Sequence, residues 1–289
     1  MLNTSKLAPR RLAQAGVLTF ALALLGGPAS ASHSWNGYHW AWTDWPSNTP
    51  IPLMLGNNVG STWIPFLNTA SSDWNSPISP YWPAFATSVV NGGINPKTCK
   101  ATNGMVQVCA AKYGYNGWLG VAQIWLTGSH ITKGTVKLND SYFSLATYNQ
   151  PSWRHMVVCQ EVGHTLGLDH QNTDFSDDNL GTCMDYTNDP TGATQGGLNN
   201  EHPDEHDYEE LDIVYDHNDG FSTVATQPVA SSPHGHGHSH SGVQLAALNI
   251  PADDWGQAVR FTSGGKGRVF VKELSKTERM VTFVTWIKP

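Results

Sequence analysis

Basic residues are absent from the middle of this chain. No lysine or arginine occurs between Arg154 and Arg260, whereas that interval holds 18 of the 23 acidic residues. Nucleic-acid binding depends on cationic side chains that neutralise phosphates, so this distribution excludes nucleic acid as an expected partner. The last 30 residues, by contrast, carry seven lysines and arginines.

Long apolar runs are also scarce, and the one that exists lies at the N-terminus. Lys6, Arg10 and Arg11 precede an apolar stretch over 12–25, which the small residues at 29–31 follow. This order is typical of a secretory signal, so residues 1–31 are predicted to be removed and the mature protein to be secreted and extracellular. The formal charge of −7 then becomes −10, because three cations leave with the signal. An uncleaved membrane anchor is the alternative, although the run is short for a bilayer span.

The four cysteines lack any C-x-x-C spacing, which argues against a thiolate zinc site. An exported protein can form disulfides, and the number of cysteines is even. Cys99 and Cys109 flank a turn signal at 102–104, so they are expected to pair across a hairpin. Cys159 is then left to pair with Cys183.

The remaining pattern predicts an α+β fold. Apolar periodicity indicates strands at 51–55, 105–111, 120–127, 135–138, 269–271 and 281–286, and helices at 61–74, 151–167 and 204–217. Residues 223–242 have a linker composition and include alternating histidines that could bind a metal ion weakly: His234, His236, His238 and His240.

The motif that points most strongly to a chemistry lies at residues 160–170 and lacks one histidine. Residues 160–170 fit the pattern H-E-x-x-H-x-x-G-x-x-H at every fixed position except the first, where Gln160 stands. Gln160 and His164 lie four residues apart and share one helix face, and Gly167 allows a turn that returns His170 to the same point. The spacing predicts up to three zinc ligands, with Glu161 beside them as general base and acid.

This segment resembles the metzincin superfamily of zinc endopeptidases and is closest in character to matrixin-like bacterial members. The sequence Cys183-Met184-Asp185-Tyr186 resembles the metzincin Met-turn. The resemblance covers roughly residues 35–220. It implies that Met184 forms a hydrophobic floor beneath the ligands and that Tyr186 approaches the metal or the oxyanion. It also implies a catalytic domain with a twisted mixed sheet, an active-site helix and a Met-turn.

Together these features predict four segments: a signal peptide (1–31), a metzincin-like catalytic domain (32–222), a His-rich linker (223–242) and a small C-terminal β extension (243–289). The expected function is a secreted zinc endopeptidase that hydrolyses peptide bonds of a protein or peptide substrate. Two alternatives stay open. One is an inactive zinc-binding module that binds protein or polysaccharide, and the other is a cell-surface protein whose metal only stabilises the fold.

Crowded carboxylates repel one another unless cations lie near. Three explanations of how the protein accommodates the acidic interval stay open. Docking of the basic C-terminal residues is one, and a simply solvated acidic face is another. The third is calcium binding in loops rich in oxygen ligands, through Asp174, Asp177, Asp178 and Asp189.

Overall fold

The structure is a computed structural model that describes residues 33–43, 49–76, 83–226 and 254–288. One mixed β-sheet runs through this part of the chain. Its strand order is β3-β2-β4-β6-β5-β9-β8-β7, and β1 pairs with β6 off this path. The bounds are β1 (His39–Trp40), β2 (Met54–Asn58), β3 (Ser88–Asn91), β4 (Val106–Ala111), β5 (Trp118–Thr127), β6 (His130–Asn139), β7 (Gln257–Phe261), β8 (Gly267–Glu273) and β9 (Glu278–Trp286). The predicted signal peptide and the four histidines of the linker lie outside the described residues.

The sheet changes character at β5. Strands β2, β3, β4 and β6 run parallel to one another, whereas β5 is antiparallel to β6 on one side and to β9 on the other. Strands buried on both faces read as continuous apolar runs, and β4 and β5 show this pattern. On the other side of β5, the C-terminal strands β9, β8 and β7 continue the same sheet.

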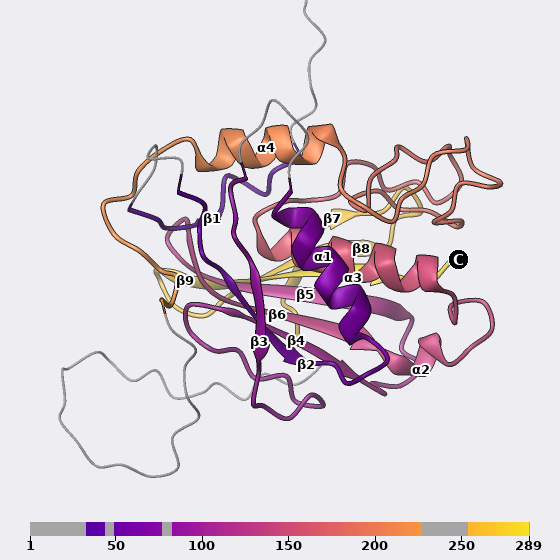
Figure 1. Cartoon of the computed structure of the whole chain (residues 1–289), viewed down its shortest axis with the longest axis horizontal. Coiled ribbons are helices and arrows are strands. Elements are labelled where there is room, and N and C mark those ends of the chain that lie inside the picture. The colour runs from indigo at the N-terminus through magenta and orange to yellow at the C-terminus, as the bar shows by residue number, and fades with distance from the viewer. Residues whose placement is uncertain (1–32, 44–48, 77–82, 227–253, 289) are drawn as a thin grey trace, which may run out of the picture. The chain divides into compact units, whose positions relative to one another are not determined.

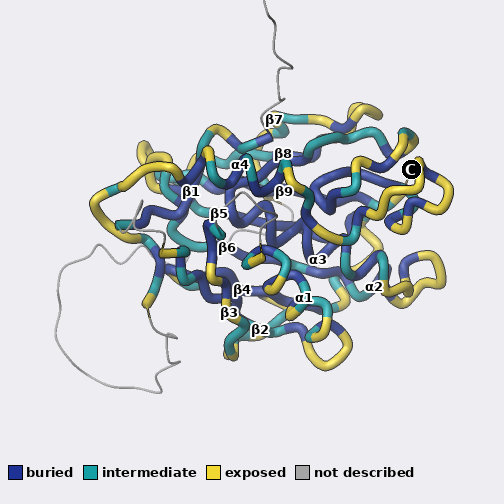
Figure 2. The backbone as a smooth tube through the Cα atoms, turned by 45° about the horizontal axis from the view of Figure 1, so that its top comes forward, coloured by how far each residue is buried: buried dark blue, intermediate teal, exposed yellow. Residues whose placement is uncertain are grey.

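Four helices accompany the sheet in the described ranges: α1 (Ile64–Trp74), α2 (Asp140–Phe143), α3 (Pro151–Thr165) and α4 (Glu205–Tyr215). Figure 1 shows α1 and α3 together in front of the sheet, with α4 along one side. The indole of Trp74 on α1 donates to the carbonyl of Cys159 on α3 (3.2 Å). Figure 2 shows buried backbone running through α3 and the central strands, and the main core lies between them.

The three predicted helices and the six predicted strands all exist, with shifted ends. The first strand spans 54–58 rather than 51–55, and β1, β3, β7 and α2 were not predicted. These four are short or half-exposed elements with weak periodicity. No helix in the described ranges has the length and apolarity needed to cross a membrane.

Candidate active site

Helix α3 carries the first half of the motif, and its two ends follow from the sequence. Pro151 occupies the first helical turn, where a missing N–H costs nothing. Gly167 follows the C-terminal end with φ +108°, and a Cβ there would lie 2.3 Å from the carbonyl oxygen of Tyr38. Only glycine fits this turn. The turn brings His170 back beside His164, as the spacing predicted.

His164 and His170 face each other through their Nε2 atoms, which lie 3.2 Å apart. The Nδ1–H of His164 donates to the carbonyl of Leu168 (2.9 Å), so its Nε2 carries a lone pair. Each ring is also stacked: His164 lies 4.4 Å from Phe283, and His170 lies 4.5 Å from Tyr186. Burial lowers the pKa of His164 well below its usual range and that of His170 to about 4. Both imidazoles are therefore neutral at physiological pH.

An arginine of β8 sets the proton position on His170. Arg268 Nη1 lies 3.0 Å from His170 Nδ1, and a guanidinium can only donate. Asp169 Oδ1 also lies 3.3 Å from this Nδ1, but it already accepts from Arg268 and from the backbone N–H of His170. The Arg268 contact therefore favours a proton on Nε2 of His170, where it donates to the bare Nε2 of His164. Arg268 also forms a buried ion pair with Asp169, which Arg260 joins at 2.7 Å. Both imidazoles are thus fully hydrogen-bonded within the protein.

Gln160 is buried, and its amide is fully engaged. Its Nε2 donates to the carbonyls of Cys183 (2.7 Å) and Asp185 (3.2 Å), which fixes the orientation of the amide. Its Oε1 accepts from the hydroxyl of Thr285 on β9. The oxygen that the sequence offered as a third ligand is therefore hydrogen-bonded to the C-terminal strand.

Glu161 points toward β5 and β9. It has no exposed surface, and a Cβ at Gly120 on β5 would lie 2.3 Å from Glu161 Oε1, so glycine makes room for the carboxyl group. Burial raises the pKa of Glu161 to about 8. Thr285 Oγ1 lies 2.5 Å from Glu161 Oε1 and also contacts Gln160 Oε1.

The proton count at Thr285 agrees with a neutral Glu161. A hydroxyl has one proton, so only one of the two contacts of Thr285 can use it. The Gln160 oxygen carries no proton, and therefore a protonated Glu161 supplies the second one. The other oxygen, Oε2, has no hydrogen-bond partner. In this arrangement Glu161 is an acid that holds its proton, not a base.

Tyr186 and Met184 pack against two different elements, Tyr186 against β9 and Met184 against α3. The hydroxyl of Tyr186 donates to the carbonyl of Val284 on β9 (2.5 Å). Met184 is fully buried beside Gly163 of α3. The predicted disulfides Cys99–Cys109 and Cys159–Cys183 are both present, and the second joins α3 to the segment that contains Met184.

These contacts decide whether the residues fit a catalytic zinc ion. Such a site needs three bare donor atoms and an open position for water. Here His170 Nε2 carries a proton, Gln160 Oε1 accepts from Thr285, and β9 covers Glu161. With β8 and β9 in place, the residues do not fit a catalytic zinc ion.

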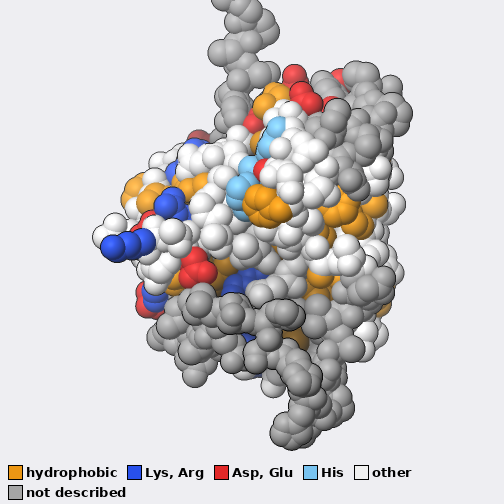
Figure 3. Space-filling model, turned by 90° about the vertical axis from the view of Figure 1, so that its left-hand side faces the viewer, with side chains coloured by type: hydrophobic (Ala, Val, Ile, Leu, Met, Phe, Trp, Pro, Cys, Tyr) orange, Lys and Arg blue, Asp and Glu red, His pale blue; other side chains and the backbone are white. Residues whose placement is uncertain are grey.

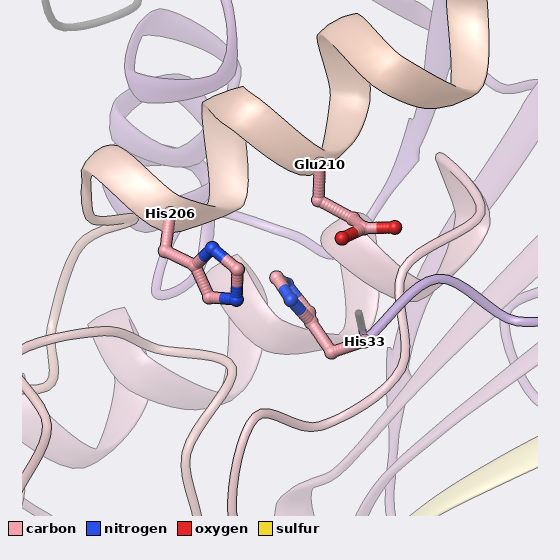
Figure 4. Close-up of side chains that lie close together, drawn as sticks. All are labelled: His33, His206 and Glu210. Atoms are coloured by element: carbon pink, nitrogen blue, oxygen red, sulfur yellow. The ribbon is translucent and has the colours of Figure 1, made fainter. Parts of the chain in front are cut away.

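The structure brings together two histidine groups that the sequence reasoning missed. Figure 4 shows His33, His206 and Glu210, whose side chains point toward one another. Their potential ligand atoms lie within 4.8 Å of one another. His33 Nε2 contacts Asp207 (3.0 Å), while its buried Nδ1 has no hydrogen-bond partner. The i, i+4 spacing of His206 and Glu210 on α4 was a signal available in the sequence.

The second group consists of His39, His217 and Asp219. Neither group includes the four aspartates predicted to bind calcium. The carboxylate of Asp189 accepts from Thr191 and Thr194 of its own loop, and Asp177 accepts from Asn172. Calcium binding stays a prediction.

Comparison with known proteins does not identify a family for this chain. No protein-family model matches the chain, and no curated protein matches its sequence. Among solved structures the chain is similar to high choriolytic enzyme 1, a hatching enzyme zinc-protease from the medaka fish Oryzias latipes. The TM-score is 0.33 at 10% identity, over 63% of this chain and 96% of that one. A similarity this weak carries no argument about function.

Proposed function

We propose that the protein is a secreted zinc-dependent endopeptidase of metzincin type, held latent by its own C-terminal strand. The motif at 160–170 and the Met-turn-like segment around Met184 support the peptidase part of this proposal. The predicted signal peptide and the two disulfides support secretion. The substrate is a protein or peptide in extended conformation.

The observation that carries the proposal is the position of β9, which lies as a bound peptide would. It pairs antiparallel with β5, Val284 opposite Val121 and Thr285 opposite Gly120. An extended peptide commonly binds a protein by adding a strand to a free sheet edge. Without β9, the backbone of β5 would present such an edge directly beside the motif.

The Val284–Thr285 peptide unit occupies the place of the bond to be cleaved. The carbonyl oxygen of Val284 accepts from the hydroxyl of Tyr186, which is the contact expected for a group that stabilises a developing oxyanion. Thr285 Oγ1 lies between Gln160 and Glu161, where a hydrolytic water would have to stand. Glu161 and Tyr186 are therefore our proposed catalytic residues.

Release of β8 and β9 would change the state of each motif residue. Without Arg268, the Nδ1–H of His170 can donate to Asp169, which lies 3.3 Å away, and its Nε2 becomes bare. Without Thr285, the Oε1 of Gln160 loses its donor. Solvent entering the site would lower the pKa of Glu161 from about 8 toward its usual value, so that it could accept a proton. His164, His170 and Gln160 are the residues we propose as zinc ligands in that open form.

The test loosens β9 without substituting a residue of the motif. Phe283→Ala removes the ring that stacks on His164, and Thr285→Pro removes a backbone donor near the C-terminal end of β9, where it pairs with β5. With zinc supplied, both variants should hydrolyse casein faster than the parent, and adding Glu161→Ala should abolish the gain. Phe270→Ala is the matched control, because its ring packs on Trp255 rather than on the motif.

The inactive zinc-binding module is the second candidate, and the engagement of the Gln160 amide favours it. If the loosened variants stay folded by circular dichroism and bind zinc through His164 and His170, but cleave neither casein nor a peptide library, the peptidase proposal is wrong. The module would then be the better description.

A further inference from the structure

A second cluster of imidazoles lies far from the motif in sequence and surrounds one carboxylate. His39 comes from β1, His130 begins β6, and His217 and Asp219 follow α4. Figure 3 looks at the side of the molecule where β1 and the end of α4 lie, and histidine side chains gather there beside an acidic one. The side chains of His39 and Asp219 are each 8% exposed, and that of His217 is 42% exposed.

Three ligand-type atoms form a nearly equilateral triangle. The Nε2 atoms of His39 and His217 lie 3.0 Å apart, and Asp219 Oδ1 lies 3.2 Å from the first and 3.3 Å from the second. Zinc bonds to nitrogen and oxygen are about 2.0–2.2 Å long, so two ligands of a tetrahedral ion lie about 3.3 Å apart. The triangle therefore has the size of one face of a tetrahedral zinc site.

Hydrogen bonds behind the triangle orient its lone pairs inward. The Nδ1–H of His39 donates to the carbonyl of Gly37 (2.7 Å), so a neutral His39 has a bare Nε2. The backbone N–H of Trp42 donates to Asp219 Oδ2 (3.0 Å), leaving Oδ1 to face the imidazoles. A bare nitrogen facing a carboxylate oxygen at 3.2 Å is repulsive unless a metal ion or a proton lies between them. Ligands held by such outer hydrogen bonds are characteristic of metal sites.

We propose that His39, His217 and Asp219 bind a structural Zn²⁺ ion, distinct from the motif at 160–170. We expect water to complete the fourth position, since the side chain of His217 is 42% exposed to solvent. His130 Nε2 contacts Asp219 Oδ1 (3.1 Å) and holds the carboxylate from outside the triangle. The ion would join β1 to the segment after α4, two parts of the chain that no disulfide connects among the described residues.

The binding test uses the mature full-length chain with four background substitutions, His234→Ala, His236→Ala, His238→Ala and His240→Ala. These remove the linker tract, which could bind zinc by itself. Zinc titrated against a competing chelator should show a site whose affinity falls at least about 100-fold in His217→Ala and in Asp219→Asn. His130→Ala should weaken binding less, by about 10–100-fold.

Controls separate this site from the other histidine groups. His206→Ala and His164→Ala should leave the affinity of this site unchanged. An anomalous-scattering map at the zinc edge, from crystals of the parent protein, should show a peak between His39, His217 and Asp219. Zinc should also raise the melting temperature of the parent protein and of His164→Ala, but not that of Asp219→Asn.

Two results would overturn the proposal. One is a zinc stoichiometry that His217→Ala and Asp219→Asn leave unchanged, in variants shown to be folded. The other is an anomalous map without density at the triangle, which would mean that a protonated His39 balances Asp219 in place of a metal ion.

Discussion

The hydroxyl of Thr285 joins the C-terminal strand β9 to Gln160 and Glu161 of the motif. Thr285→Val removes this hydroxyl with almost no change in side-chain shape. The substitution removes the donor to Gln160 Oε1 and one partner of Glu161 in a site without exposed surface. An orphaned buried acceptor costs about 1–3 kcal/mol. Glu161 keeps a backbone hydrogen bond with Ala122, so losing the Thr285 contact costs Glu161 less than it costs Gln160. We expect the free energy of unfolding to fall by about 2–4 kcal/mol.

Thr282→Val supplies the matched control on the same strand. Thr282 is as buried as Thr285, but its hydroxyl accepts from the amide of Gln123 (3.1 Å), which also contacts Met280 Sδ (3.4 Å). Its loss should cost about 1 kcal/mol. Urea unfolding at pH 6.5, followed by tryptophan fluorescence and circular dichroism, gives both values. Equal costs for the two variants would show that the Thr285 contacts do not hold β9 over the motif.

Three further predictions concern the same region. The folded pKa of Glu161 (about 8) exceeds the usual value of 4.5, so the folded state binds an extra proton between them. Its contribution to the free energy of unfolding therefore falls by about 1.4 kcal/mol per pH unit as the pH rises across this window. Glu161→Gln should remove that slope in urea titrations from pH 5 to 8, and an unchanged slope would contradict the assignment. Asp169→Asn leaves the buried Arg268 with one partner fewer and should cost about 3–5 kcal/mol. Adding Arg268→Met should recover part of this loss in thermal melts, and no recovery would mean that the pair is not coupled. Replacing Cys159 and Cys183 by serine should cost about 3 kcal/mol, since their separation is 24 residues, and a loss below 1 kcal/mol in urea would count against this chain-entropy estimate.

Local patterns in the sequence determined the framework of the motif. The spacing from Gln160 to His170 required a helix face followed by a turn, and Gly167 supplies the positive φ of that turn. Helix α3, both disulfides and most strands followed from periodicity, turn signals and cysteine number. Such features depend on neighbours within a few residues, so they can be recognised without the fold.

Only the tertiary structure decided what surrounds the motif. Residues 269–271 and 281–286 were recognisable as strands, but nothing local indicates that β9 pairs with β5 or that Thr285 contacts Glu161. The donation from Arg268 to His170, and hence the proton position on that ring, depends on residues 98 positions apart. The triangle of His39, His217 and Asp219 likewise joins chain segments 178 residues apart. The sequence therefore determined which chemical groups the protein has, whereas long-range strand pairing decided which of them meet and in which protonation state, because burial and hydrogen-bond partners are set by the fold.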